Sequence, residues 1–196
     1  PEIWAANEDW FFEPWGRDEF ISLPGLLITT GKLEDAKKIF RLFGSFQKDG
    51  LIPNRIFDTS KKESAMYNTS DASLWFIQAL KKYAVSTGDW DFAVEMLPAV
   101  QAVISGYENG TGYMHYNRFN SIKMDPSDGL VVTPAQSTWM DADPYGADHP
   151  VTPRNGKAVE INALWYSNLR FFAGLLEKSG KDKAMSEHYA KLADKV

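Results

Sequence analysis

Residues 70–97 read SDASLWFIQALKKYAVSTGDWDFAVEML and contain the repeating unit of the chain. The first part of this stretch is apolar on most sides and follows Ser70, a residue type that commonly caps a helix. The pair Thr87-Gly88 ends that helix, because glycine is the usual residue after a last helical turn. A second, more charged helix begins at Trp90 and continues past Pro98. The stretch therefore predicts a helical hairpin.

The same hairpin pattern occurs twice more. Residues 18–29 and 33–43 flank Gly31, and residues 159–172 and 181–196 flank Gly180. In each pair the first helix is the more apolar, as an inner ring of helices would be. We therefore expect an all-α fold, an (α/α)6 toroid of helical hairpins. Because a closed ring needs twelve helices and this chain supplies six, residues 1–196 are expected to form a single, partial domain, the amino-terminal half of the barrel.

The composition bounds the class of protein. The chain has 196 residues, a formal net charge of −5 and 44% hydrophobic residues, enough for one sizeable core. No basic run exceeds a pair such as Lys61-Lys62, so neither nucleic acid nor a membrane is an expected partner. The apolar runs are shorter than a membrane span, and the first residues lack an export pattern. The absence of cysteine excludes thiolate chemistry and favours the cytoplasm.

The first candidate for chemistry is Trp15-Gly16-Arg17-Asp18, directly before the first inner helix. A guanidinium fork beside a carboxylate offers donors and acceptors to the vicinal hydroxyls of a sugar. The alternative is structural: Asp18 caps the helix and Arg17 pairs with it.

The second candidate lies in the long connection 106–158. Thr138-Trp139-Met140-Asp141 places an acid near a bulky ring. Partial desolvation there would raise the pKa of the acid, so that it could serve as a proton donor. Asp141 is the candidate acid, and an Asx turn in a surface loop is the alternative. Short strands are also expected in this connection, around 113–116 and 129–133.

Further polar residues surround these two candidates. Asn54, Tyr67, Asn68 and Asp71 close the connection 44–70 onto the second inner helix, where each contacts substrate or makes structural hydrogen bonds. Glu160 is either a substrate contact at the rim or a charge favoured by the helix terminus. Two more residues are expected to contact substrate: Arg154 in the connection before Glu160, and Asn162 after it in the third inner helix.

Metal and cofactor signatures are weak. The three histidines are far apart and lack zinc-ligand spacing. The stretch from Asp125 to Gly129 resembles part of a calcium loop without its downstream glutamate, so a turn is expected there. With no phosphate-binding loop in the sequence, we expect no cofactor.

Several long motifs together resemble the amylo-α-1,6-glucosidase domain of glycogen debranching enzymes. They are Trp15 to Leu27, Gly50 to Arg55, Tyr67 to Phe76, Thr138 to Ala142, and Thr152 to Tyr166. The resemblance implies an (α/α)6 barrel that hydrolyses α-1,6-linked glucose at branch points of an α-glucan with inversion. Similar toroidal enzymes, such as glucoamylases and trehalases, and a non-catalytic helical scaffold are the alternatives.

The resemblance also implies roles for particular residues. Arg17 and Asp18 hold the hydroxyls of the terminal glucose, Asp141 is the general acid and Glu160 supports it. The general base is expected beyond residue 196, so this chain alone is expected to be inactive. Trp15, Trp139 and Trp165 are expected to offer stacking faces to the sugar rings. The unpaired flanks of a half-barrel predict self-association.

Overall fold

The computed structural model describes residues 13–115, 117–144, 146 and 149–196. Trp4, Trp10, Tyr116 and the chain's first residues lie outside this described part. The elements are α1 (Gly16–Leu23), the π-helix η1 (Pro24–Ile28), α2 (Leu33–Ser45), β1 (Arg55–Ile56), β2 (Ala65–Met66), α3 (Ala72–Thr87), α4 (Trp90–Glu95), α5 (Leu97–Asn109), β3 (Thr111–His115), β4 (Arg118–Met124), β5 (Val131–Val132), α6 (Val159–Ser179) and α7 (Lys183–Lys195).

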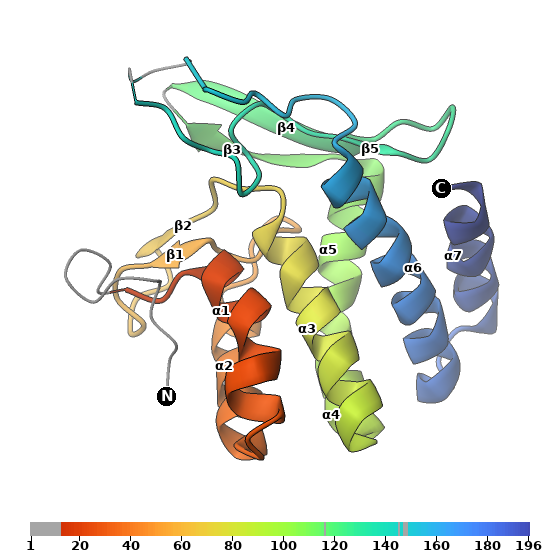
Figure 1. Cartoon of the computed structure of the whole chain (residues 1–196). Helices are drawn as coiled ribbons and strands as arrows, with labels where there is room; N and C mark the ends of the chain where they lie inside the picture. Colours follow the sequence, from red (N-terminus) through yellow and green to blue (C-terminus); the bar gives the residue numbers. More distant parts are fainter. Residues whose placement is uncertain (1–12, 116, 145, 147–148) are drawn as a thin grey trace.

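The helices form three consecutive hairpins. Gly31, Gly88 and Gly180 have φ values of 74°, 74° and 66°, so each predicted turn uses the left-handed conformation that glycine permits. The first helices of the hairpins, α1, α3 and α6, form one row, in which α3 packs against both neighbours. Helices α2, α4 and α5 lie behind this row, and α7 packs along α6 (Figure 1).

The prediction of an all-α fold is wrong in one respect, because the connections between hairpins contain two small antiparallel sheets. One pairs β1 with β2, and the other has the order β3-β4-β5. Strands β3 and β5 fall where short strands were expected. Strand β4 was not expected, although Asn120 and Ile122 are buried and their neighbours are exposed, the alternation of a half-buried strand.

Two prolines interrupt the helices. Pro24 cannot donate a backbone hydrogen bond, and the chain continues as a π-helix from that residue, with the Thr29 N–H donating to its carbonyl at 3.0 Å. Pro98 is the second residue of α5, where a helix tolerates proline. The second hairpin therefore has two outer helices, the short α4 and the longer α5, instead of the one continuous helix predicted.

Aromatic rings fill the space between the first two hairpins. Phe20 lies 5.0–5.7 Å, between ring centroids, from Phe40, Phe43 and Phe76. Trp165 of α6 is fully buried, stacks on Tyr107 and donates from its indole nitrogen to a backbone carbonyl. The expectation that Trp165 offers a face to a sugar is therefore wrong.

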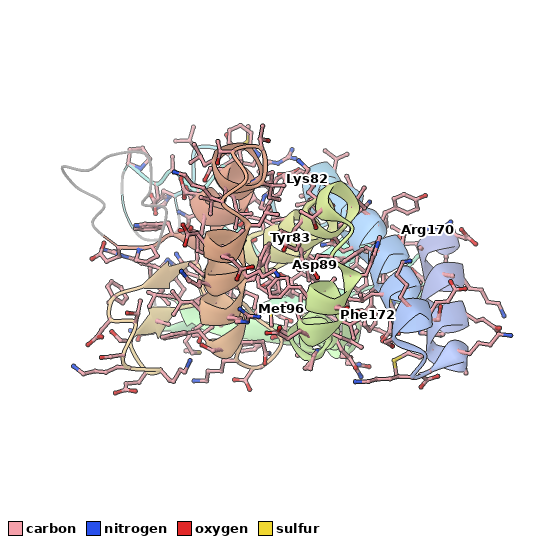
Figure 2. The ribbon with its side chains drawn as sticks, turned by 90° about the horizontal axis from the view of Figure 1, so that it is seen from below. Lys82, Tyr83, Asp89, Met96, Arg170 and Phe172 are labelled. Carbon is pink, nitrogen blue, oxygen red and sulfur yellow. The ribbon has the colours of Figure 1, made fainter. Side chains whose placement is uncertain are left out.

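The end of the helices away from the sheets has its own polar cluster. Figure 2 looks at this end and labels Tyr83 and Asp89. The Tyr83 hydroxyl donates to Asp89 at 3.0 Å, and Lys37 pairs with the same carboxylate at 2.7 Å. Within the described residues, no helix is both long and apolar enough to cross a bilayer.

Candidate active site

The amino-terminal ends of α1, α3 and α6 all point toward the side of the molecule that carries the sheets (Figure 1). Each of these ends bears a carboxylate: Asp18 in α1, Asp71 directly before α3, and Glu160 in α6. Exposed backbone N–H groups give a helix start a partial positive charge, which favours these carboxylates. The topology therefore gathers acidic groups from three distant parts of the sequence at one end of the fold.

Arg17 joins two of the predicted carboxylates. Its guanidinium donates to both oxygens of Asp71, from Nε at 2.7 Å and from Nη2 at 3.1 Å. Its remaining nitrogen, Nη1, donates to Asp141 Oδ2 at 2.9 Å. The alternative in which Arg17 pairs with Asp18 is not what the structure shows. One planar cation thus holds a buried acid and a solvent-facing acid together.

The two acids differ in their surroundings. The Asp71 side chain is 2% exposed, whereas that of Asp141 is 44% exposed. Burial raises the pKa of Asp71, and its pairing with Arg17 opposes that rise. Burial alone would lower the pKa of Arg17, but the charges and hydrogen bonds of Asp71 and Asp141 raise it overall. The cluster therefore combines one cation with two carboxyl groups.

Gly16 brings the segment before β1 against the start of α1. A Cβ atom at this position would lie 2.3 Å from the Pro53 carbonyl oxygen, a contact that no side chain tolerates. The Gly16 N–H donates to the Asn54 carbonyl at 2.9 Å, and the Arg17 N–H donates to Asn54 Oδ1 at 3.3 Å. Asn54 Nδ2 reaches Asn68 at 3.5 Å. The structure thus brings Asn54 and Asn68 into the Arg17 cluster.

The loop that carries Asp141 is fixed to the start of α3. The Ser70 N–H donates to the Ser137 carbonyl at 2.7 Å, and the two buried hydroxyls are 2.8 Å apart. Nearer the acid, Gln136 Nε2 donates to the Asp141 carbonyl at 3.4 Å. Trp139 is 59% exposed, so its ring faces solvent beside the acid.

Three predicted residues lie close to members of the cluster in the sequence, and two of them, Trp15 and Tyr67, have partners of their own. Trp15 directly precedes α1, and the Arg55 guanidinium lies 4.7 Å from its ring centroid. The Tyr67 hydroxyl donates to the Phe46 carbonyl at 2.5 Å, and burial raises the pKa of Tyr67. Asp18 is half-buried within the first turn of α1 and is not its capping residue.

The three remaining predicted residues are bonded elsewhere. Arg154 forms a two-pronged ion pair with Glu160, with Nε 2.9 Å from Oε1. Asn162 is buried and uses its whole amide on backbone groups, bonding the N–H and carbonyl of Val131 and the carbonyl of Ala158. This amide therefore joins β5 to α6, and among the contacts of the described residues none links these three side chains to Arg17.

Sequence reasoning missed Gln136 and Ser137, which position the acid-bearing loop. No sequence motif marks them; the only local signal is Pro134, two residues before Gln136. The expected turn at Asp125–Gly129 is confirmed, and Lys157 Nζ lies 2.7 Å from Asp125 and 2.6 Å from Asp128. This ammonium holds the pKa of Asp125 well below its usual range.

Within the described part of the chain, no group of three or more His, Asp or Glu side chains is arranged to hold a metal ion.

Comparison with known proteins agrees with the resemblance seen in the sequence. The family described as amylo-alpha-1,6-glucosidase matches residues 3–196, and the chain belongs to this family. The chain is also similar to the glycogen debranching enzyme of Saccharomyces cerevisiae, with 30% identity over 212 residues. That match covers 84% of this chain and 14% of the yeast protein, so the chain spans about one seventh of its relative's length.

Proposed function

We propose that this chain is the substrate-binding part of an inverting amylo-α-1,6-glucosidase that releases α-1,6-linked glucose at branch points of an α-glucan. The observation that carries the proposal is the guanidinium of Arg17, which bonds to both Asp71 and Asp141. This cluster lies where the row of α1, α3 and α6 begins. Membership of the glucosidase family supplies the reaction class. The proposed architecture is a closed (α/α)6 toroid to which this chain contributes three hairpins.

Asp141 is the general acid in this proposal. It is the more exposed carboxylate on Arg17, so a glycosidic oxygen can approach it from solvent. Its carboxyl proton passes to the leaving oxygen as the bond from the glucose anomeric carbon to that oxygen breaks. Asp71, buried against the other side of the guanidinium, holds Arg17 in place.

The attacking water requires a second carboxylate. In inverting glycosidases the two carboxyl groups are about 6.5–9.5 Å apart, which leaves room for water on the opposite face of the sugar. Water attacks the anomeric carbon, and its proton goes to the base. We propose that this base lies beyond residue 196 and that Glu160, held by Arg154, plays a supporting part.

The remaining polar groups bind the glucose unit. Arg17 and Asp18 would hold hydroxyls of the terminal sugar, while Asn54 and Asn68 extend the same polar surface. Trp15 lies two residues before Arg17 and Trp139 two residues before Asp141. The Trp139 ring faces solvent. A sequence without cysteine fits our proposal of a cytoplasmic enzyme, in a reducing compartment.

The test uses Asp141→Asn in the intact protein, with Asp35→Asn on the outer helix α2 as a matched control. We expect Asp141→Asn to lose most glucose release from a branched limit dextrin while still binding oligosaccharide. Unchanged turnover would remove Asp141 from the acid role.

Two further measurements test the remaining parts of the proposal. NMR of the first product tests inversion, which predicts β-glucose; initial release of α-glucose would exclude it. The 196-residue chain alone should release no glucose from the dextrin, and activity would show that the base lies within it. Panose, maltose and trehalose, compared as substrates of the intact protein, distinguish the related toroidal enzymes.

A further inference from the structure

A second surface lies beside the Asp141 loop and is lined by the sheet of β3, β4 and β5. It is a groove of about 620 Å³ between residues 118–121 of β4 and the loop segments 132–136 and 150–156. A second hollow of about 390 Å³ lies between the β3-β4 hairpin on one side and β2 with residues 48–51 on the other. Phe119 lines both, so the two hollows share one aromatic wall.

The Phe119 ring is held in position although it faces solvent. The side chain is 60% exposed, and its Cζ atom lies 2.7 Å from where a Cβ of Gly112 would stand on the neighbouring strand. Phe119 pairs across the ladder with Met114, so Phe119 and Gly112 share a sheet face. The ring therefore lies along the sheet over the space that glycine leaves open.

The groove has the chemistry that suits a neutral polyol. Among the described residues that line it, Arg118 is the sole charged side chain. The side chains of Gln136 and Asn155 add amides, whereas the amide of buried Asn120 bonds to Arg118. Amides supply both donors and acceptors to hydroxyl groups, and an aromatic face packs on the apolar face of a sugar ring. A nucleic acid would require several cations here, which this lining lacks.

One residue, Gln136, links the groove to the loop that carries Asp141. Gln136 lines the groove and also donates to the Asp141 carbonyl. The backbone of Gln136 has φ 58°, and Arg154 on the facing segment has φ 50°, both in the left-handed region that non-glycine residues rarely adopt. The Gln136 N–H bonds the Pro153 carbonyl at 3.1 Å and ties the two segments together. Such local strain is typical of binding sites.

We propose that this groove, with Phe119 as its aromatic platform, binds the α-1,4-linked main chain of the glucan whose branch glucose reaches Asp141. The inference rests on the proposed function for the identity of the branched substrate. The ligand class, a linear α-glucan, can be tested by binding alone, without turnover.

The test compares three variants of the intact protein: Phe119→Ala, Phe119→Tyr and the control Val85→Ala. Val85 is 65% exposed on α3, so its truncation removes a similarly exposed apolar side chain elsewhere. Isothermal titration with maltoheptaose and with maltose measures affinity, and circular dichroism checks folding. Kinetics on a branched dextrin and on panose separate KM from kcat.

We expect Phe119→Ala to weaken maltoheptaose binding by about 3- to 10-fold, in keeping with the loss of one ring contact. Phe119→Tyr should restore most of the affinity, and Val85→Ala should leave it unchanged. The KM for the dextrin should rise by a similar factor, with kcat on panose unaffected. Equal affinity of Phe119→Ala and wild type for maltoheptaose, or no binding of maltoheptaose by the wild type, would overturn the proposal.

The failure of the proposed function would look different. Turnover that survives Asp141→Asn refutes the acid assignment, but it leaves the Phe119 binding result intact. Loss of maltoheptaose affinity in Phe119→Ala with normal glucose release from panose supports the groove independently of the chemistry.

Discussion

The unequal burial of the two carboxylates on Arg17 gives a quantitative prediction. Their shortest contacts with the guanidinium are nearly equal, 2.7 Å for Asp71 and 2.9 Å for Asp141. Asp71 is 2% exposed and Asp141 is 44% exposed, and the Arg17 side chain between them is 13% exposed. Removal of Asp71 therefore leaves a buried cation without its two-pronged partner, whereas removal of Asp141 leaves a pair that is still largely intact.

The expected costs follow from that difference. Breaking a buried pair destabilises a protein by about 3–5 kcal/mol, whereas exposed pairs contribute about 0–1 kcal/mol. We expect Asp71→Ala to lower the free energy of unfolding by about 3 kcal/mol or more, and Asp141→Ala by less than about 1 kcal/mol. Asp71 makes no side-chain capping bond to α3, so lost capping does not enter this difference.

Urea unfolding of the chain, followed by circular dichroism, measures both costs from the midpoint and slope. The single variant Arg17→Met and the double variant Arg17→Met/Asp71→Ala complete the test, because removal of both buried charges should cost less than the sum of the two single changes. If Asp141→Ala costs as much as Asp71→Ala, burial does not govern this cluster and the division of roles between the two acids is wrong.

Three further predictions concern other parts of the chain. Gly16→Ala should separate the Pro53–Asn54 segment from α1 and cost about 1–3 kcal/mol in urea unfolding, from two lost hydrogen bonds; a neutral effect would contradict the close contact. Asp89 accepts from the Phe92 N–H and its pKa is lowered, first by the hydrogen bond from Lys37, so its contribution to stability should be full well above pH 3.8 and lost as the pH falls below that value. Asp89→Ala should cost about 1 kcal/mol at pH 7 and flatten this acid dependence, and an unaltered pH profile would refute it. Exposed apolar residues such as Tyr166 should make the isolated chain self-associate in sedimentation velocity, and a compact monomer would contradict that expectation.

The hairpins could be predicted from the sequence because their signals are local. A helix is marked by apolar residues three or four positions apart, and each hairpin turn is marked by a glycine that adopts positive φ in the structure. Strand β4 was harder to predict, since it is stabilised by pairing with a strand on either side, and one of these, β5, has only two residues. The register of β4 depends on these long-range partners, which periodicity alone does not supply.

The candidate site was predictable as a set of residue types, but not as a set of contacts. Arg17 lies 54 positions from Asp71 and 124 positions from Asp141, so no spacing in the sequence predicts that one guanidinium binds both. For Trp165, the residue type suggested a site residue, but its position in the fold excludes it. The sequence marks it as an aromatic residue near polar ones, yet it lies on the buried side of α6.

The charges at the site bear on which sugars it can accept. Arg17 is balanced by Asp71, so the cluster offers no surplus positive charge whether or not Asp141 holds the proton that it donates. A phosphorylated sugar bears about −1.5 to −2 charges at pH 7 by analogy with phosphorylated side chains, and no unpaired cation of this cluster balances them. An uncharged glucosyl unit needs no such balance, and its hydroxyls can both donate to the carboxyl groups and accept from the guanidinium. The charges of the Arg17 cluster therefore favour a neutral glucan over a sugar phosphate. The uncharged amides of the Phe119 groove also suit a neutral ligand.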